Sequence, residues 1–276
     1  VGNTLCPGIL DHHHLVSYLG STAALVLRHP EFLAVCGEYR PSSDSPRVTL
    51  VTHVEPDLDA VCSVYLATCW LTQGCFPPAA AALARYVDRV DMGCQGMSQQ
   101  RPFALYSAYS VLLWRLASRK WRNDADKWTA CIHQGAEIVD FVVTEANKRG
   151  VSILEVDAFD APGQFGPDDR QRVTDDLVAY RAKLADPRTA AQSVRLSLPD
   201  PFGGRQTVDG LCVRDVQSPT DPAAVMFFKD WARSDCLRAS ADHGYVALSV
   251  FQSETSESHR RCWLSVRPDS GVTLSG

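Results

Sequence analysis

The stretch Val48-Thr-Leu-Val-Thr-His-Val-Glu-Pro-Asp-Leu-Asp-Ala60 decides the predicted fold. Its hydrophobic start, Val48 to Val51, is typical of a buried parallel strand, and the residues from about Leu58 to Leu71 favour a helix. Potential ligands at the carboxyl end of a parallel strand suit a divalent metal ion. The loop between the expected strand and helix carries three of them, His53, Asp57 and Asp59.

A second polar cluster lies near the start of the chain. The run Asp11-His12-His13-His14 follows a short apolar segment, Gly8-Ile9-Leu10, which predicts another strand. Two strand-end clusters, one rich in Asp and one rich in His, indicate a shared site, because the carboxyl ends of adjacent parallel strands lie together. We therefore expect His12 to meet the Asp57 and Asp59 loop.

Composition places the chain among ordinary globular proteins. It has 276 residues, a net charge of −5, 45% hydrophobic residues and 21% charged residues. This charge gives no global attraction for nucleic acid, and no apolar stretch is long enough to span a bilayer. The ten cysteines are scattered without a Cys-x-x-Cys pair, which favours reduced thiols and a cytoplasmic location. A start at Val1 rather than Met indicates a processed chain or a piece of a longer protein.

The pattern along the chain predicts an α/β fold with a parallel sheet flanked by helices, and a smaller α+β C-terminal domain. The expected domains are 1–188, which binds metal, and 189–276, which contacts substrate. Helical patterns cover 21–28, 58–71, 79–90, 103–118, 125–148 and 168–184. Strands are expected at 151–156 and, by alternation, at 193–198, 225–228, 245–251 and 262–266.

Two adjacent metal ions need bridging carboxylates and nitrogen ligands. His53 would hold the first ion, and His12 or His13 the second. The segment Tyr86-Val-Asp-Arg-Val-Asp-Met-Gly93 supplies two candidates for the bridge, Asp88 and Asp91. Manganese or magnesium fits better than zinc, because carboxylates dominate and no Cys lies near the ligands.

These motifs resemble the DHH phosphoesterase superfamily. Thr52 to Ser63 is similar to its first motif, His-x-x-x-Asp-x-Asp entering a helix, and Asp11-His12-His13 is similar to the motif that names it. Gly20 to Leu25 resembles the helix start that follows that motif, and Val87 to Gly93 the motif with the bridging Asp. The resemblance implies a parallel α/β fold, two manganese or magnesium ions, and hydrolysis of phosphoesters or phosphoanhydrides.

Carried onto this chain, the resemblance assigns roles to single residues. It makes His13, Asp57 and Asp59 catalytic and places Asp91, preferred over Asp88, at the bridge. The full candidate metal set is His12, His53, Asp57, Asp59, Asp91, Asp88 and Asp11. The candidate substrate contacts are His13, His14, Ser21, Thr22 and Arg205.

The chain departs from the family in two ways. The His cluster precedes the Asp-x-Asp motif, which is the reverse of the family order and indicates a circular permutation or a truncated first copy. The family's last metal-binding Asp has no clear match, and Asp157 and Asp160 are the nearest substitutes.

The expected function is therefore a metal-dependent phosphohydrolase that acts on a nucleotide, a short oligonucleotide or another phosphate compound. The alternative is a DHH-like sensor or interaction module with weak or no catalysis. Single residues also have structural explanations. Asp57 is suited to cap a helix, Asp88 to pair with Arg85 or Arg89, and Arg205 to be a surface charge after a glycine turn that enters a strand.

Overall fold

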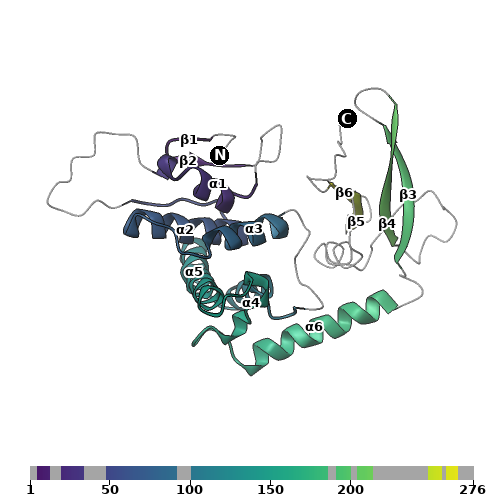
Figure 1. The fold of residues 1–276 in the computed structure, drawn as a ribbon. Coiled ribbons are helices and arrows are strands. Elements are labelled where there is room, and N and C mark those ends of the chain that lie inside the picture. Colours follow the sequence, from purple (N-terminus) through teal and green to yellow (C-terminus); the bar gives the residue numbers. More distant parts are fainter. Residues whose placement is uncertain are drawn as a thin grey trace. The chain divides into compact units, whose positions relative to one another are not determined.

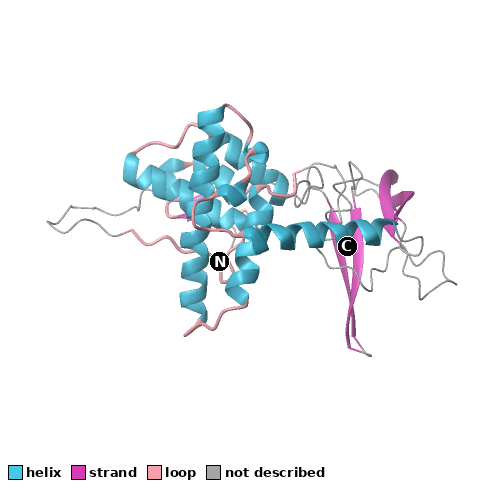
Figure 2. Cartoon of the chain, turned by 90° about the horizontal axis from the view of Figure 1, so that it is seen from below, coloured by secondary structure: helices cyan, strands magenta, loops and turns pink. Residues whose placement is uncertain are grey.

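The computed structural model describes residues 5–12, 20–33, 48–91, 101–185, 191–199, 204–213, 248–256 and 259–266. The chain divides into two compact units, the first formed by Val1–Asp91 and Phe103–Arg170, the second by Met92–Pro102 and Gln171–Gly276. Helices dominate the described part of the first unit, whereas the described strands of the second unit form hairpins (Figures 1 and 2).

The first unit contains most of the helices of the described chain. They are α1 (Thr22–Arg28), α2 (Leu58–Gln73), α3 (Ala80–Asp91), α4 (Leu105–Ala117), α5 (Asp124–Arg149) and the start of α6 (Pro167–Ala185). Short 3-10 turns and a minimal hairpin complete it: η1 (Pro30–Leu33), η2 (Ile153–Glu155), η3 (Ala158–Asp160), β1 (Leu5–Cys6) and β2 (Ile9–Leu10).

Local sequence signals explain where α2 begins and ends. Asp57 caps its start, because the carboxylate accepts a hydrogen bond from the amide of Ala60 at 2.8 Å. Gly74 ends it in the left-handed region, with φ of 70°, where a side chain would be strained. The predicted helix from about Leu58 to Leu71 is therefore confirmed and extends to Gln73.

The core of the first unit is formed by the apolar faces of its helices. Helix α1 packs on α2 and α3, and α5 packs on α2 and α4. The largest fully buried aliphatic side chains on these five helices are Leu25, Val61, Leu66, Leu83, Val87, Leu105, Leu112, Leu116 and Ile138. Helix α1, although only 7 residues long, thus lies on the two helices that carry the acidic candidates.

The predicted parallel sheet flanked by helices is wrong. Every strand pair in the described residues is antiparallel and two-stranded: β1 with β2, β3 with β4, and β5 with β6. Val48 to Val51 has no strand pairing, and the Val51 side chain is 86% exposed. The predicted strand at 151–156 is also wrong, because η2 lies there. A short apolar run shows β-propensity but does not show whether a partner strand exists.

The second unit contains most of α6 and two hairpins. Strand β3 (Ala191–Pro199) pairs with β4 (Arg205–Val213), and β5 (Leu248–Ser256) pairs with β6 (His259–Val266). The strands predicted at 193–198 and 262–266 lie within β3 and β6, and the one predicted at 245–251 overlaps β5. The strand predicted at 225–228 lies outside the described residues. Strand β4 begins at Arg205, where a glycine turn was expected to enter a strand, although alternation did not predict it.

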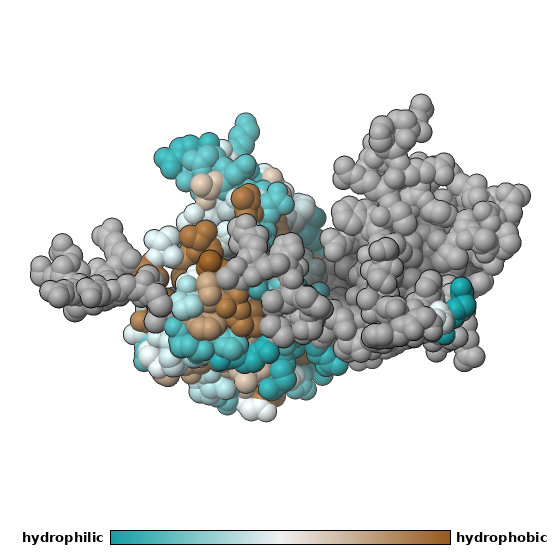
Figure 3. All heavy atoms as spheres, turned by 90° about the horizontal axis from the view of Figure 1, so that it is seen from above, coloured by the Kyte–Doolittle hydropathy of each residue, from teal (hydrophilic) through white to brown (hydrophobic). Residues whose placement is uncertain are grey.

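The described surface carries some large apolar side chains. Hydrophobic atoms lie among hydrophilic ones on the face seen in Figure 3. Val48, Val51 and Val54, on the segment before α2, are 47%, 86% and 76% exposed. Among the helices in the described ranges, none has the length and apolar character needed to cross a bilayer.

Gly135 allows α5 to approach α2 closely, and we expect Gly135→Ala to destabilise the protein. A Cβ at this position would lie 2.8 Å from Cγ1 of Val61, a fully buried and branched side chain. Overpacking of this kind costs about 1–3 kcal/mol and should exceed the gain of about 1 kcal/mol from replacing a helical glycine. Urea unfolding of the wild type and Gly135→Ala measures the difference in their free energies of unfolding.

A second variant shows whether the contact with Val61 is the cause. Val61→Ala makes room for the added methyl group, so the double variant Gly135→Ala with Val61→Ala should lose less stability than the sum of the two single variants. Strict additivity would show that the contact with Val61 is not the cause, and a Gly135→Ala protein as stable as the wild type would show that the helices move apart without cost.

Candidate functional site

The loop before α2 presents a partly exposed pair of candidate ligands. Nε2 of His53 lies 3.6 Å from Oδ1 of Asp57, and the two side chains are 43% and 56% exposed. The same Oδ1 accepts the amide of Ala60, so Asp57 is the cap of α2. The structural role expected for Asp57 is therefore present, together with a neighbouring imidazole.

Asp59 links α2 to the beginning of α1. Its side chain is 6% exposed, and its carboxylate accepts the backbone N–H groups of Thr22 and Ala23, each at 2.8 Å. The hydroxyl of Ser63, one turn further along α2, donates to the same carboxylate at 3.4 Å. The first N–H groups of a helix have no partner within the helix, so a carboxylate from another helix is a favourable acceptor for them.

Asp88 supports the same helix end from α3. Its Oδ1 accepts the backbone N–H of Ser21 at 2.7 Å and the Ser21 hydroxyl at 2.6 Å. The Ser21 hydroxyl oxygen in turn accepts the amide of Ala24 at 3.3 Å as the N-cap of α1. Two carboxylates from two other helices thus hold the start of α1.

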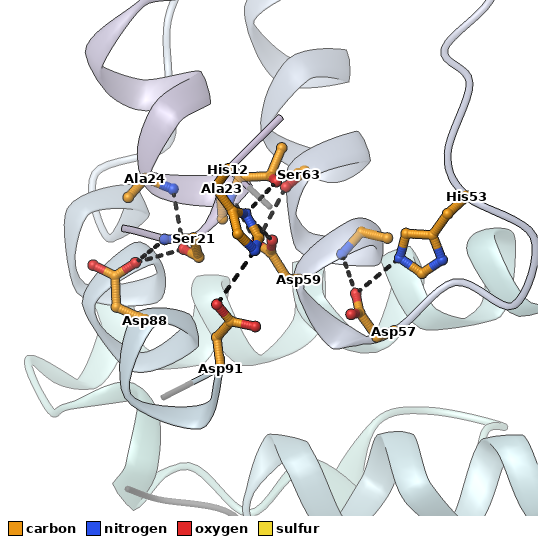
Figure 4. Close-up of polar contacts among 12 residues, drawn as sticks. His12, Ser21, Ala23, Ala24, His53, Asp57, Asp59, Ser63, Asp88 and Asp91 are labelled. Carbon is orange, nitrogen blue, oxygen red and sulfur yellow. Dashed lines mark hydrogen bonds and ion pairs between the residues drawn. The ribbon is translucent and has the colours of Figure 1, made fainter. Parts of the chain in front are cut away.

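His12 lies between the acidic residues of α2 and α3 (Figure 4). Its Nδ1 is 2.9 Å from the hydroxyl oxygen of Thr22 and 3.6 Å from Oδ2 of Asp59. Its Nε2 is 3.6 Å from Oδ2 of Asp91, the last residue of α3. His12 and Asp59 are mostly buried, and Asp91 is 23% exposed.

The acidic side chains act on one another electrostatically. Burial is the main cause that raises the pKa of Asp59 from 3.8 to about 6, and the charges of Asp91 and Asp57 raise it further. The hydrogen bonds from Ala23 and Thr22 act in the opposite direction. Burial, followed by the charges of Asp59 and Asp57, also raises the pKa of the Cys62 thiol. Ionising Asp59 is therefore costly in the metal-free protein.

The chemistry of this donor set fits manganese or magnesium, which accept carboxylate oxygen and, for manganese, imidazole nitrogen. In the described part of the chain, no group of three or more His, Cys, Asp or Glu side chains is already arranged to hold an ion. Instead, Asp59 lies on the Nδ1 side of His12 and Asp91 on its Nε2 side, and His53 pairs with Asp57. The N···O distances of 3.6 Å in these pairs exceed a usual hydrogen bond.

The structure separates the sequence-predicted residues into groups. It brings His12 beside Asp59 and Asp91. The carboxylate of Asp88 accepts the hydroxyl of Ser21, and the hydroxyl of Thr22 lies beside the ring of His12. Asp11 is buried, whereas His13 and His14 lie outside the described residues.

Other candidates are placed elsewhere. Arg205 begins β4 in the second unit. Asp157 and Asp160, the substitutes for the missing Asp, form ion pairs with Arg170 at 2.8 and 2.5 Å. In this structure both carboxylates therefore serve to bind an arginine.

Two contacts of the site were not predicted. Thr22 orients the His12 ring through its hydroxyl. Tyr109 of α4 donates its hydroxyl hydrogen to the backbone carbonyl of Pro56, in the loop before α2. Neither contact has a sequence signal, because no motif or spacing connects the partners.

In comparisons with known proteins, no family model, no curated protein and no solved structure matches this chain. The likeness to the DHH superfamily therefore stays a hypothesis that depends on the motifs.

Proposed function

We propose that this protein is a manganese- or magnesium-dependent phosphohydrolase of the DHH type. The observation that carries the proposal is the meeting of His12, Asp59 and Asp91, which come from three separate segments of the chain. A substrate with a phosphoester or phosphoanhydride, such as a nucleotide or a short oligonucleotide, matches the two-ion chemistry that the motifs imply.

The residues divide naturally into ligands and supports. Nε2 of His12 and Asp91 would hold one ion, with the charge of Asp59 close by on the Nδ1 side of the ring, and His53 with Asp57 would extend the site toward a second. The hydroxyl of Thr22, 2.9 Å from Nδ1 of His12, fixes the ring so that Nε2 is directed at Asp91. When bound, the metal would supply an activated water and offset phosphate charge.

Electrostatics supports this assignment. The charges of Asp91 and Asp57 add to burial in raising the pKa of Asp59 to about 6, so the carboxylates repel one another in the metal-free protein. A divalent cation would relieve this repulsion and favour the ionised form. His13 and His14 are proposed to contact the substrate phosphate.

Calorimetric titration with Mn²⁺ tests the proposal. We expect two sites, and we expect hydrolysis of a generic phosphodiester that requires Mn²⁺ and is lost in excess chelator. Full hydrolysis in excess chelator would contradict the metal mechanism, and a chain that neither binds Mn²⁺ nor hydrolyses phosphodiesters would contradict the enzyme.

A specific observation favours a second candidate, a sensor or interaction module without turnover. Asp57, Asp59 and Asp88 each accept backbone N–H groups at a helix start, so part of the acidic set has a structural role. For this candidate, the titration should show one Mn²⁺ site or none, and phosphodiester hydrolysis should not be detected.

A further inference from the structure

Tyr109 connects the buried interior of α4 to the loop that carries His53 and Asp57. Its side chain is 3% exposed, and its hydroxyl donates to the carbonyl of Pro56, 53 residues earlier in the chain. The hydroxyl also lies 3.5 Å from Sγ of Cys131 on α5. Burial raises the pKa of Tyr109, so the hydroxyl keeps its proton and remains a donor.

The loop that Tyr109 holds is strained. Glu55 has a φ of 44°. Among the described residues it is the only one other than glycine with a positive φ. This region is unfavourable for an L-residue, and a following proline restricts Glu55 further toward extended conformations. A strained conformation persists where surrounding contacts over-determine it. The contact with Pro56 and the cap formed by Asp57 lie directly after the strained residue.

We propose that Tyr109 is a positioning residue of the metal site: by holding the Pro56 carbonyl, it fixes the strained turn that sets His53 beside Asp57. This inference rests on the proposed function. It assigns Tyr109 no contact with metal or substrate.

The variant Tyr109→Phe removes the hydroxyl and keeps the ring. Tyr65→Phe is the matched control, because Tyr65 is also buried and its hydroxyl donates to Asp140 at 3.0 Å, a residue outside the acidic site. Two measurements on the full chain separate the variants. Amide hydrogen exchange of the peptide covering 48–61 reports the turn without metal, and titration reports Mn²⁺ affinity.

We expect Tyr109→Phe to speed exchange in this peptide and to weaken Mn²⁺ binding about tenfold or more, the usual effect of losing a contact that orients a ligand. Tyr65→Phe should change neither. Exchange in 48–61 that equals the wild type, or faster exchange with unchanged Mn²⁺ affinity, would overturn the positioning role. If the wild type binds no Mn²⁺, the proposed function fails, and the role of Tyr109 at a metal site fails with it. Hydrogen exchange in 48–61 then still decides whether Tyr109 holds the turn.

Discussion

Lowering the pH through about 6 should stabilise the metal-free wild type relative to Asp59→Asn, because burial above all raises the pKa of Asp59 to that value. The folded state binds this proton more tightly than the unfolded chain, whose carboxyl has a pKa near 3.8. The contribution of protonated Asp59 to the free energy of unfolding is therefore complete below pH 3.8, and it is lost as the pH rises through about 6. The shift corresponds to roughly 3 kcal/mol of unfolding free energy.

Urea unfolding of the wild type and Asp59→Asn, above and below the two pKa values, measures this effect. Asparagine is neutral at every pH and keeps one oxygen that can accept an N–H group of α1. Because other carboxylates titrate in the same range, only the difference between the two proteins isolates Asp59. The wild type should gain up to about 3 kcal/mol relative to Asp59→Asn on acidification.

Saturating Mn²⁺ provides the control for this experiment. A bound cation favours the ionised carboxylate, so the relative gain of the wild type at low pH should disappear when Mn²⁺ is present. If the stabilities of the two metal-free proteins change in parallel with pH, Asp59 does not titrate near 6.

Asp91→Asn should weaken Mn²⁺ binding and phosphodiester hydrolysis by roughly 100-fold or more. Losing a residue that only orients a metal ligand costs about 10- to 100-fold, and losing a ligand itself should cost at least as much. Asp91 lies 3.6 Å from Nε2 of His12 and is the last residue of α3. A negative charge at the C-terminus of a helix opposes the helix dipole, so its removal should leave stability unchanged or slightly higher. Titration, phosphodiester hydrolysis and thermal unfolding test both parts.

Asp88→Asn is the matched control, because Asp88 lies one turn earlier on the same helix. Its carboxylate binds the amide and hydroxyl of Ser21, so the variant should lose stability by about 1 kcal/mol or more while keeping Mn²⁺ affinity. The opposite result, metal binding lost in Asp88→Asn and kept in Asp91→Asn, would move the bridging role to Asp88.

The helices were the predictable part of the fold. Helix α2 has a capping Asp57 before it and Gly74 after it, and both signals are local in the sequence. The strand expected at Val48 was not predictable in this way, because pairing depends on a partner that no local pattern identifies. Alternation did not show strand β4, since Asp209 and Gly210 at its centre both have low β-propensity, and only the glycine turn before Arg205 indicated it.

The candidate site shows the same division. Residue type and spacing made His12, Asp59 and Asp91 candidates, because carboxylates and imidazoles clustered near expected element ends are uncommon. Their neighbours were hidden, since the contacts of Asp59 with the amides of Thr22 and Ala23 join residues far apart in the chain. Sequence therefore indicated which side chains could take part, whereas packing decided which of them also hold helix ends.

The dependence of α1 on carboxylates from other helices has a consequence for the order of folding. Isolated helices shorter than roughly 12 residues are marginal in water, and α1 has 7 residues. Its first amides find their acceptors on Asp59 and Asp88 only after α2 and α3 have docked. Helix α1 should therefore form late, and its interactions should be largely absent from the folding transition state. Mutations in α1 would then speed unfolding and leave the folding rate almost unchanged.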